Sequence, residues 1–294
     1  MKSSMALGID IGGSHITAAL VDLESRSIVE GSWRRERVNS QGAVTDILNA
    51  WCAVINDVFG SGMAADVKYI GIGMPGPFDY EQGISHMKNQ DKYDALFGLN
   101  VKTLLAEKLN IDAQHIRFIN DAGCFLQGEA FSGAARGHQR AIGLTLGTGL
   151  GTAVFDGHLA KDADLWNAPF QNSIAEDYIS TRWFVKRYTE ISGNVVKDVK
   201  ALVELMPTDA RINGIFDEFA KNLAGFLTDF IRNNNPEVVV VGGNIANAAE
   251  LFFPLTQQEL TAQNIHVPLL KATLGESAAI IGAASVWFEQ TVGA

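Results

Sequence analysis

The sequence predicts an α/β chain built from two related domains that face one another. Residues 7–22 and 141–157 have the same pattern of strand, glycine-containing hairpin, strand and aspartate turn, so the chain contains an internal repeat. A repeat period of well over a hundred residues is too long for a solenoid. Apolar strands also alternate with amphipathic helices, as in α/β proteins. A length of 294 residues suits one large or two medium domains, and the repeat favours two.

The first half of the chain is expected to begin with a meander of three strands, at residues 7–22 and 27–37. Apolar residues three and four apart then predict a helix over 44–58, ending near the glycines at 60–62. An exposed polar excursion is expected between the Pro75-Gly76-Pro77 turn and Gln90. The remaining elements of this half are predicted to be a strand at 69–74, a helix at 101–109, a strand at 116–119 and a helix after Asp121.

The second half is expected to open with the repeated hairpin, and its stretch 161–177 gives no clear pattern. A helix is predicted over 178–188 and a long amphipathic helix over 212–231, which the polar segment before Pro236 ends. The segment 237–241 is predicted to be a strand, because its four valines at 238–241 form an apolar run like those of strands buried in a parallel sheet. The Ala- and Gly-rich residues 277–288 predict a closely packed final helix.

Composition limits the classes of partner. With 47% hydrophobic and 19% charged residues the chain is an ordinary globular protein, and a net charge of −10 argues against nucleic-acid binding. The N-terminus shows no apolar leader and no stretch has about 18 apolar residues in succession, so we expect a cytoplasmic protein without membrane contacts. Cys52 and Cys124 are expected to be buried thiols, because two such residues form neither a disulfide framework nor a zinc site.

The pair Asn120-Asp121 stands where a predicted strand meets a predicted helix. In open α/β sheets the carboxyl ends of strands border the ligand crevice, so a carboxylate there can meet a substrate hydroxyl. The alternative is a helix cap, because Asn and Asp oxygens accept the unpaired N–H groups of a first helical turn. Alone, the pair favours the cap, and the phosphate-binding loops elsewhere in the chain favour catalysis.

Three glycine-rich turns are candidate phosphate or nucleotide sites. Gly12-Gly13-Ser14 leaves backbone N–H groups open to a phosphate, and Asp10 just upstream could hold Mg²⁺ through water. The second turn is Gly147-Thr148-Gly149, and the third, Gly242-Gly243-Asn244, could let an adenosine lie flat against the backbone. Each could equally be an ordinary turn whose glycines supply positive φ. The two hairpins match neither the P-loop pattern nor the Rossmann pattern.

Taken in order, these motifs resemble those of the ROK sugar kinases in the actin-like ATPase superfamily, over essentially the whole chain. The resemblance rests on the residues of two phosphate motifs, two connecting motifs and an adenosine motif, at 7–22, 118–133, 141–157, 238–246 and 276–287. It implies two ribonuclease-H-like domains with a central cleft, at 1–118, joined by the final helix 277–294, and at 119–276. It also implies ATP with Mg²⁺, a small sugar substrate and a homodimer.

The resemblance also implies roles for individual residues. Asp121 is similar to the family's general base on the sugar hydroxyl. Asn120, Gly76, Asn89 and Glu176 fall at sugar-binding positions, and Asp164 and Asn167 stand where the family has a Glu-x-Gly-His segment. Three features depart from the family: the cysteine-rich zinc loop is missing, Asn167 replaces its His, and Ser14 and His15 replace the usual Thr and Lys. These departures imply an altered sugar pocket.

The leading hypothesis is therefore ATP-dependent phosphorylation of a hexose or N-acetylhexosamine, with Asp121 as the general base. A catalytically silent sugar sensor of the same family is the alternative, and it would lack a DNA-binding domain, because no helix-turn-helix precedes Leu7. An actin-like ATPase that only assembles fits less well, since it has no need of Asn120-Asp121 at a sugar site.

Overall fold

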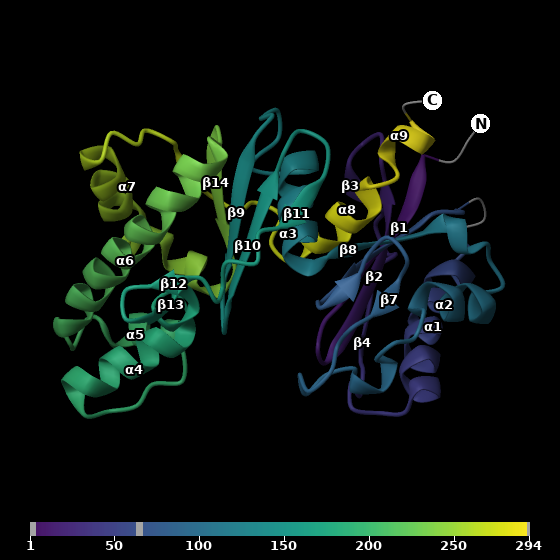
Figure 1. The fold of residues 1–294 in the computed structure, drawn as a ribbon, viewed down its shortest axis with the longest axis horizontal. Coiled ribbons are helices and arrows are strands. Elements are labelled where there is room, and N and C mark those ends of the chain that lie inside the picture. The colour runs from purple at the N-terminus through teal and green to yellow at the C-terminus, as the bar shows by residue number, and fades with distance from the viewer. Residues whose placement is uncertain (1–3, 63–66, 293–294) are drawn as a thin grey trace. The chain divides into compact units, whose positions relative to one another are not determined.

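The computed structural model describes residues 4–62 and 67–292, which form two compact units (Figure 1). The first unit is Met1–Gly133 with Glu276–Ala294, and the second is Ala134–Gly275. The expected first boundary after residue 118 therefore lies instead at Gly133. The reason is that helix α3 (Asp121–Ser132) packs against α8 (Ser277–Ser285), which places both helices in the first unit.

The first unit is built on a six-stranded sheet in the order β3-β2-β1-β5-β8, with β4 also paired to β2. Strand β1 runs antiparallel to β2 and parallel to β5, and β5 runs parallel to β8. The expected meander is confirmed. The strands are β1 (Met5–Ile11), β2 (His15–Asp22), β3 (Ser27–Ile28), β4 (Arg34–Arg37), β5 (Ile70–Met74) and β8 (Ile116–Asn120).

Helices cover both faces of this sheet. Side chains alternate between the faces of a strand, and Leu7, Ile9 and Ile11 of β1 join the apolar core formed with α1 (Val44–Gly60) and α2 (Val101–Leu109). Gly8 and Asp10 therefore face the other side, where α3 and α8 lie. The segment expected to be an irregular excursion contains a small hairpin of β6 (Phe78–Asp79) and β7 (Ile84–Ser85).

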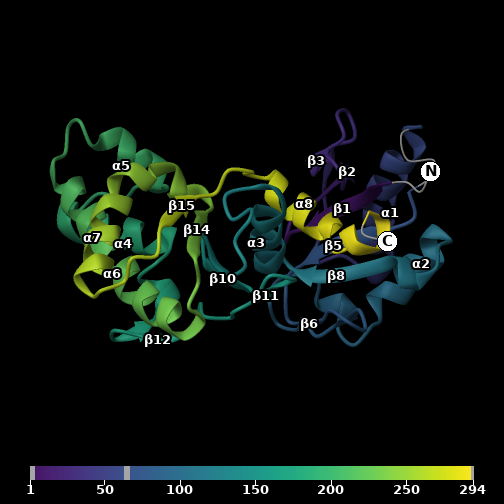
Figure 2. The same cartoon turned by 90° about the horizontal axis from the view of Figure 1, so that it is seen from above.

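Helix α8 lies unusually close to the elements beneath it, beside β1, β5 and α3 (Figure 2). A side-chain carbon at any of four glycines would collide with a backbone carbonyl of α8 or α3. These are Gly8 against Ile280, Gly71 against Ala283, Gly128 against Ala278 and Gly282 against Cys124. The expected close packing is confirmed, although the predicted helix 277–288 is divided into α8 and α9 (Phe288–Thr291).

The second unit repeats the sheet pattern of the first. Its five strands lie in the order β11-β10-β9-β14-β15, and β9 runs antiparallel to β10 and parallel to β14, just as β1 does to β2 and β5. The internal repeat read from the sequence is confirmed. The strands are β9 (Ala141–Leu146), β10 (Leu150–Phe155), β11 (Ala160–Asp162), β14 (Val238–Gly242) and β15 (Leu269–Lys271), with a separate pair β12 (Pro169–Phe170) and β13 (Ser173–Ile174).

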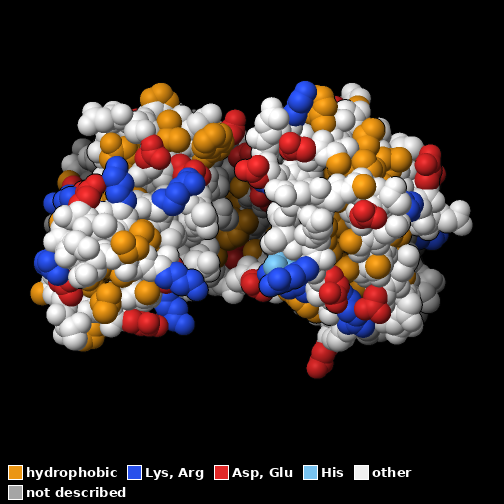
Figure 3. Space-filling model, turned by 90° about the horizontal axis from the view of Figure 1, so that it is seen from below, with side chains coloured by type: hydrophobic (Ala, Val, Ile, Leu, Met, Phe, Trp, Pro, Cys, Tyr) orange, Lys and Arg blue, Asp and Glu red, His pale blue; other side chains and the backbone are white. Residues whose placement is uncertain are grey.

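The core of the second unit is the apolar face of β9 and β14 packed on helices. Long helix α6 (Arg211–Asn234) supplies half of the buried aromatic side chains, with α4 (Thr181–Ser192), α5 (Val199–Leu205) and α7 (Phe253–Ala262) around it. Helix α4 begins three residues later than expected. Within the described ranges, none of the helices is both long and apolar enough to cross a membrane. On the face drawn in Figure 3, basic and acidic side chains are interspersed.

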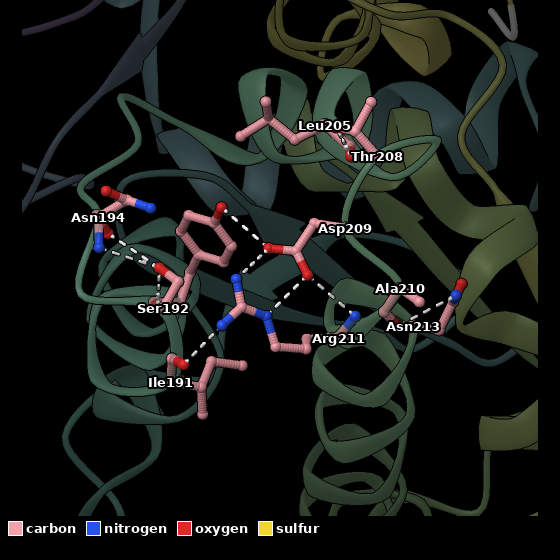
Figure 4. Close-up of polar contacts among 10 residues, drawn as sticks. Ile191, Ser192, Asn194, Leu205, Thr208, Asp209, Ala210, Arg211 and Asn213 are labelled. Atoms are coloured by element: carbon pink, nitrogen blue, oxygen red, sulfur yellow. Dashed lines mark hydrogen bonds and ion pairs between the residues drawn. The ribbon is translucent and has the colours of Figure 1, made fainter.

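A polar cluster around Asp209 joins the end of α4 to the start of α6 (Figure 4). The Asp209 carboxylate accepts hydrogen bonds from Arg211 Nε at 2.8 Å, Arg211 Nη2 at 2.7 Å and the Tyr188 hydroxyl at 3.2 Å. Arg211 also donates to the carbonyl oxygen of Ile191 at 3.0 Å. The guanidinium of Arg211 lowers the pKa of Asp209 to about 2.

We predict that Asp209→Asn lowers the melting temperature at neutral pH and that its difference from the parent narrows in acid. The folded pKa lies below the ordinary value of about 3.9, so the ionised carboxylate stabilises the fold above about pH 4 and loses that contribution as pH falls towards about 2. Thermal melts between pH 7 and pH 3 measure this. Asp217→Asn, an exposed α6 carboxylate without an ion pair among the described residues, is the control, and a parallel shift at all pH values would contradict the prediction.

Candidate active site

The first glycine hairpin joins β1 to β2 and leaves two amides open. Gly12 N–H donates to the His15 carbonyl oxygen at 2.9 Å, which closes the turn. The next two N–H groups, of Gly13 and Ser14, have no acceptor among the described residues. Ser14 Oγ lies 2.9 Å from His15 Nδ1, so the imidazole is engaged beside the turn. Two open amides on exposed residues suit an anion such as phosphate.

Asp10 lies at the carboxyl end of β1 on the side of the sheet covered by α3. Its partner in the neighbouring strand is Gly73, and a side-chain carbon there would lie 3.0 Å from Cys124 Sγ in α3. Burial, and then the nearby Asp121 carboxylate, raise the pKa of Asp10 to about 6, while Arg35 opposes the rise. The Asp121 carboxylate therefore lies close enough to Asp10 to affect its ionisation.

The structure separates the two roles considered for Asn120-Asp121. Asn120 is the helix cap, because its Oδ1 accepts the N–H groups of Ala122 at 2.8 Å and Gly123 at 3.1 Å. Asp121 is the first residue of α3, and its Oδ1 accepts the Ala122 N–H at 2.9 Å. The Asp121 side chain retains solvent-accessible surface. Loss of water around it raises the pKa of Asp121, and the Ala122 amide and then Lys92 oppose this rise.

Gly76 lies beside the cap, whereas Asn89 lies in a separate turn. A side-chain carbon at Gly76 would lie 3.2 Å from the Tyr80 hydroxyl and 4.0 Å from Asn120 Nδ2, and Asn120 Nδ2 donates to that hydroxyl at 3.1 Å. Asn89 is exposed at a positive φ of 57°, and its N–H donates to Asp94 Oδ2 at 2.9 Å. The amide side chain of Asn89 is thus left facing solvent, while that of Asn120 is already used by the fold.

In the second unit the other two glycine turns meet at one edge of the sheet. Strands β9 and β14 are parallel and pair up to Thr145 and Gly242, so Gly147-Thr148-Gly149 and Gly242-Gly243-Asn244 leave the sheet side by side. Gly243 has φ 85° and ψ 175°, and a side-chain carbon there would collide with the Leu146 carbonyl oxygen. The two turns were named independently from the sequence, and the register brings them together.

Glu176 is bound to the second glycine hairpin. Its Oε2 accepts the Leu150 N–H at 2.9 Å and touches the position that a side chain on Gly149 would occupy, and Oε1 pairs with Arg182. The carboxylate is only 17% exposed. These contacts give Glu176 a structural function at the hairpin, in addition to any function in sugar binding.

The two residues of the altered segment behave differently. Asp164 has a positive φ of 49°, and its Oδ1 accepts a hydrogen bond from Trp166 Nε1 at 2.9 Å. Asn167 is exposed, and no hydrogen bond to its side chain is seen among the described residues. The segment is held by its backbone, since Glu176 N–H donates to the Trp166 carbonyl oxygen at 3.0 Å.

Sequence reasoning missed several residues around Asp10 and Asp121. Tyr80 binds Asn120, Tyr93 binds the first hairpin, and Lys92 and Arg35 bring positive charge to the two carboxylates. Only Tyr93 carried a signal, as an aromatic residue in a polar stretch. The others are distant in sequence, and the tertiary fold alone brings them together.

Comparison with known proteins identifies the family. The ROK family model matches residues 6–161 and 170–290, which is nearly the whole chain. The chain belongs to the ROK family. It is 25% identical to a glucokinase of Thermotoga maritima with both chains covered completely, and 26% identical to an N-acetyl-D-glucosamine kinase of Photobacterium profundum over 95% of this chain and 98% of that one.

A solved structure supports the same fold. The ROK family glucokinase of Streptomyces griseus, determined in complex with glucose and AMPPNP, superposes with a TM-score of 0.75 at 23% identity, covering 96% of this chain and 98% of that one. The expected fold class is confirmed. The two matched stretches of the family model leave out residues 162–169, which include Asp164 and Asn167.

We predict that Gly243→Ala destabilises the protein by about 1–3 kcal/mol, because its backbone conformation is essentially restricted to glycine and the added methyl group meets a backbone oxygen. It should also reduce the rise in melting temperature that Mg·ATP produces. Differential scanning fluorimetry with and without Mg·ATP measures both effects.

Gly214→Ala in α6 is the matched control. Nothing lies within 4 Å of its added carbon, and Ala in a helix interior is favoured over Gly by roughly 0.5–1 kcal/mol. This variant should be as stable as the parent or more so. If Gly243→Ala melts at the parent temperature, the close approach to Leu146 does not constrain that turn.

Proposed function

We propose that this ROK protein is an ATP-dependent kinase that phosphorylates a hydroxyl of a hexose or N-acetylhexosamine. The observation that carries the proposal is the position of Asp121 at the start of α3. Neighbouring Asn120 takes over the helix cap, so the Asp121 carboxylate is not needed as the cap and stays exposed at the start of α3. The names of the T. maritima and P. profundum relatives support this substrate class.

Asp121 would act as the general base. Its carboxylate takes the proton of the sugar hydroxyl while that oxygen forms a bond to the γ-phosphorus, and the bond from phosphorus to the bridging oxygen of ADP breaks. The raised pKa of Asp121 makes its ionised form a stronger base than an ordinary carboxylate. Positioning and charge stabilisation supply most of the rate in phosphoryl transfer, so an accurately held base adds to a prearranged site.

Each unit, taken by itself, has open backbone amides that suit a phosphate. Gly13 and Ser14 offer N–H groups in the first unit, and in the second unit the Thr148 and Gly149 N–H groups are likewise without acceptors among the described residues. Such donors are fixed before the reaction and so stabilise developing charge without reorganisation. Gly242-Gly243-Asn244, which lacks long side chains, would take the adenosine.

Asp10 fits the role of a Mg²⁺ holder. Carboxylate oxygen is a preferred donor for Mg²⁺, and the crowding with Asp121 that raises the pKa of Asp10 is relieved by a nearby cation. Among the described residues no group of three or more His, Cys, Asp and Glu side chains is arranged for a metal ion. Asp10 would therefore hold the ion through water, and the ion, when bound with ATP, neutralises phosphate charge.

We predict that Asp121→Asn reduces kcat by about 10²-fold or more, because the amide cannot accept the hydroxyl proton. A coupled assay of ADP release with Mg·ATP, run across hexoses and N-acetylhexosamines, measures the rate. Binding of the sugar should persist, and it can be followed by the shift in melting temperature. Asp46→Asn, an exposed carboxylate of α1, is the control and should retain the parent rate.

Two results would contradict the proposal. Equal rates for Asp121→Asn and the parent would remove Asp121 from the mechanism. Sugar that raises the melting temperature of the parent without turnover of any sugar would favour the silent sensor. That alternative is the function to expect if the altered segment with Asp164 and Asn167 no longer supports catalysis.

A further inference from the structure

The first glycine hairpin lacks a cation of its own. Its turn consists of two glycines and a serine, and the following His15 is engaged with Ser14 Oγ at 2.9 Å. Asp10 and Asp121 lie at the same end of the sheet, and burial, followed by the charge of Asp121, raises the pKa of Asp10 to about 6, so a second negative charge is disfavoured there. A phosphoryl group arriving there brings more negative charge. A protein cation held over the hairpin would add to the charge neutralisation that Mg²⁺ bound with ATP supplies.

The residues that follow Asn89 are docked on this hairpin. The Tyr93 hydroxyl donates to the Gly12 carbonyl oxygen at 2.6 Å. The Tyr93 ring is fully buried, with its centroid 5.3 Å from that of Trp51, and its N–H donates to the Ser40 carbonyl oxygen at 2.7 Å. These contacts fix the backbone on both sides of the tyrosine, including that of Lys92.

Lys92 consequently lies over the glycine turn. A methyl group built on Gly13 would lie 3.8 Å from Lys92 Cδ, and no other atom comes within 4 Å of it. The positive charge of Lys92 also lowers the pKa of Asp121, so its ammonium group is close enough to act on the proposed base. Lys92 is partly buried and forms no ion pair among the described residues.

Arg35, the other cation near Asp10 and Asp121, already forms an ion pair. Its Nη1 lies 3.0 Å from Glu276 Oε2, and this pair holds β4 to the residue preceding α8. Its charge lowers the pKa of Asp10, whereas Lys92 is the cation that lowers the pKa of Asp121. Of these two cations, only Lys92 lies over the open amides of the turn. It is also the one that forms no ion pair among the described residues.

We propose that Lys92 is a catalytic residue that contacts the transferring phosphoryl group at the first glycine hairpin. This assignment rests on the proposed kinase function. During transfer the sugar oxygen bonds to the γ-phosphorus, its proton passes to Asp121 and ADP departs with the electron pair of the broken bond. The ammonium group of Lys92 donates to the phosphoryl oxygens and keeps its protons throughout. The attraction between the Lys92 ammonium group and the phosphoryl group is greatest while that group lies between the ADP oxygen and the sugar oxygen.

The test compares Lys92→Met, Lys92→Gln and Lys92→Arg with the parent in the ADP-release assay, using the best sugar substrate. Loss of an interaction made mainly in the transition state should lower kcat by on the order of 10²-fold in the Met and Gln variants, with KM for the sugar within about threefold of the parent. Lys92→Arg, which keeps the charge, should recover most of kcat. Lys108→Met removes an exposed lysine of α2 that binds Asn49 and should leave kcat unchanged.

The remaining outcomes overturn the assignment, and they separate it from the proposed function. A parent enzyme that turns over sugar while Lys92→Met and Lys92→Gln keep its kcat excludes Lys92 from the reaction and leaves the kinase function intact. A raised KM for sugar at unchanged kcat places Lys92 at the sugar and not at the phosphoryl group. Lack of turnover in the parent itself overturns the kinase function and this assignment together. Melting curves of all variants identify any loss of rate caused by unfolding.

Discussion

The contact between helix α8 and the elements beneath it determines the geometry of the first unit. Gly8, Gly71, Gly128 and Gly282 let backbone meet backbone there, and any side chain would push the elements apart. This packing holds α3 against β1 and β5, so that Asp121 at the start of α3 comes close to Asp10 at the end of β1. The proposed active site therefore depends on residues 277–285, near the other end of the chain.

The internal repeat gives the two units the same strand and hairpin arrangement, but the side chains at equivalent positions differ. When the two hairpins are aligned on their glycines, Asp10 corresponds to Thr145 and Gly12 to Gly147. The first unit thus places carboxylates beside its open amides, and the second has none at the equivalent position of its strand. The carboxylates Asp10 and Asp121 thus lie in the first unit, whereas the second unit has two adjoining glycine turns.

The charged residues that act on Asp10 and Asp121 are distant from them in the sequence. Lys92 moderates the raised pKa of Asp121, Arg35 moderates that of Asp10, and Glu276 acts in the opposite direction on Asp10. Lys92 and Arg35 lie outside the motifs recognised in the sequence, whereas Glu276 begins the second connecting motif. They reach the site because Tyr93 docks its segment on the first hairpin and because α8 brings Glu276 to β4.

By itself the sequence determined the repeated hairpins, the alternation of strands and helices, the buried long helix and the place of Asn120-Asp121 at a strand-to-helix corner, because hydrophobic periodicity and glycine turns are local signals. Only the tertiary structure decided that Asn120 is the cap, that Glu176 braces the second hairpin, that α3 belongs with the first unit and that Lys92 lies over the Gly13 turn. These features depend on which distant segments pack together. Close backbone contacts and charge interactions between such segments produce no periodic pattern in the sequence.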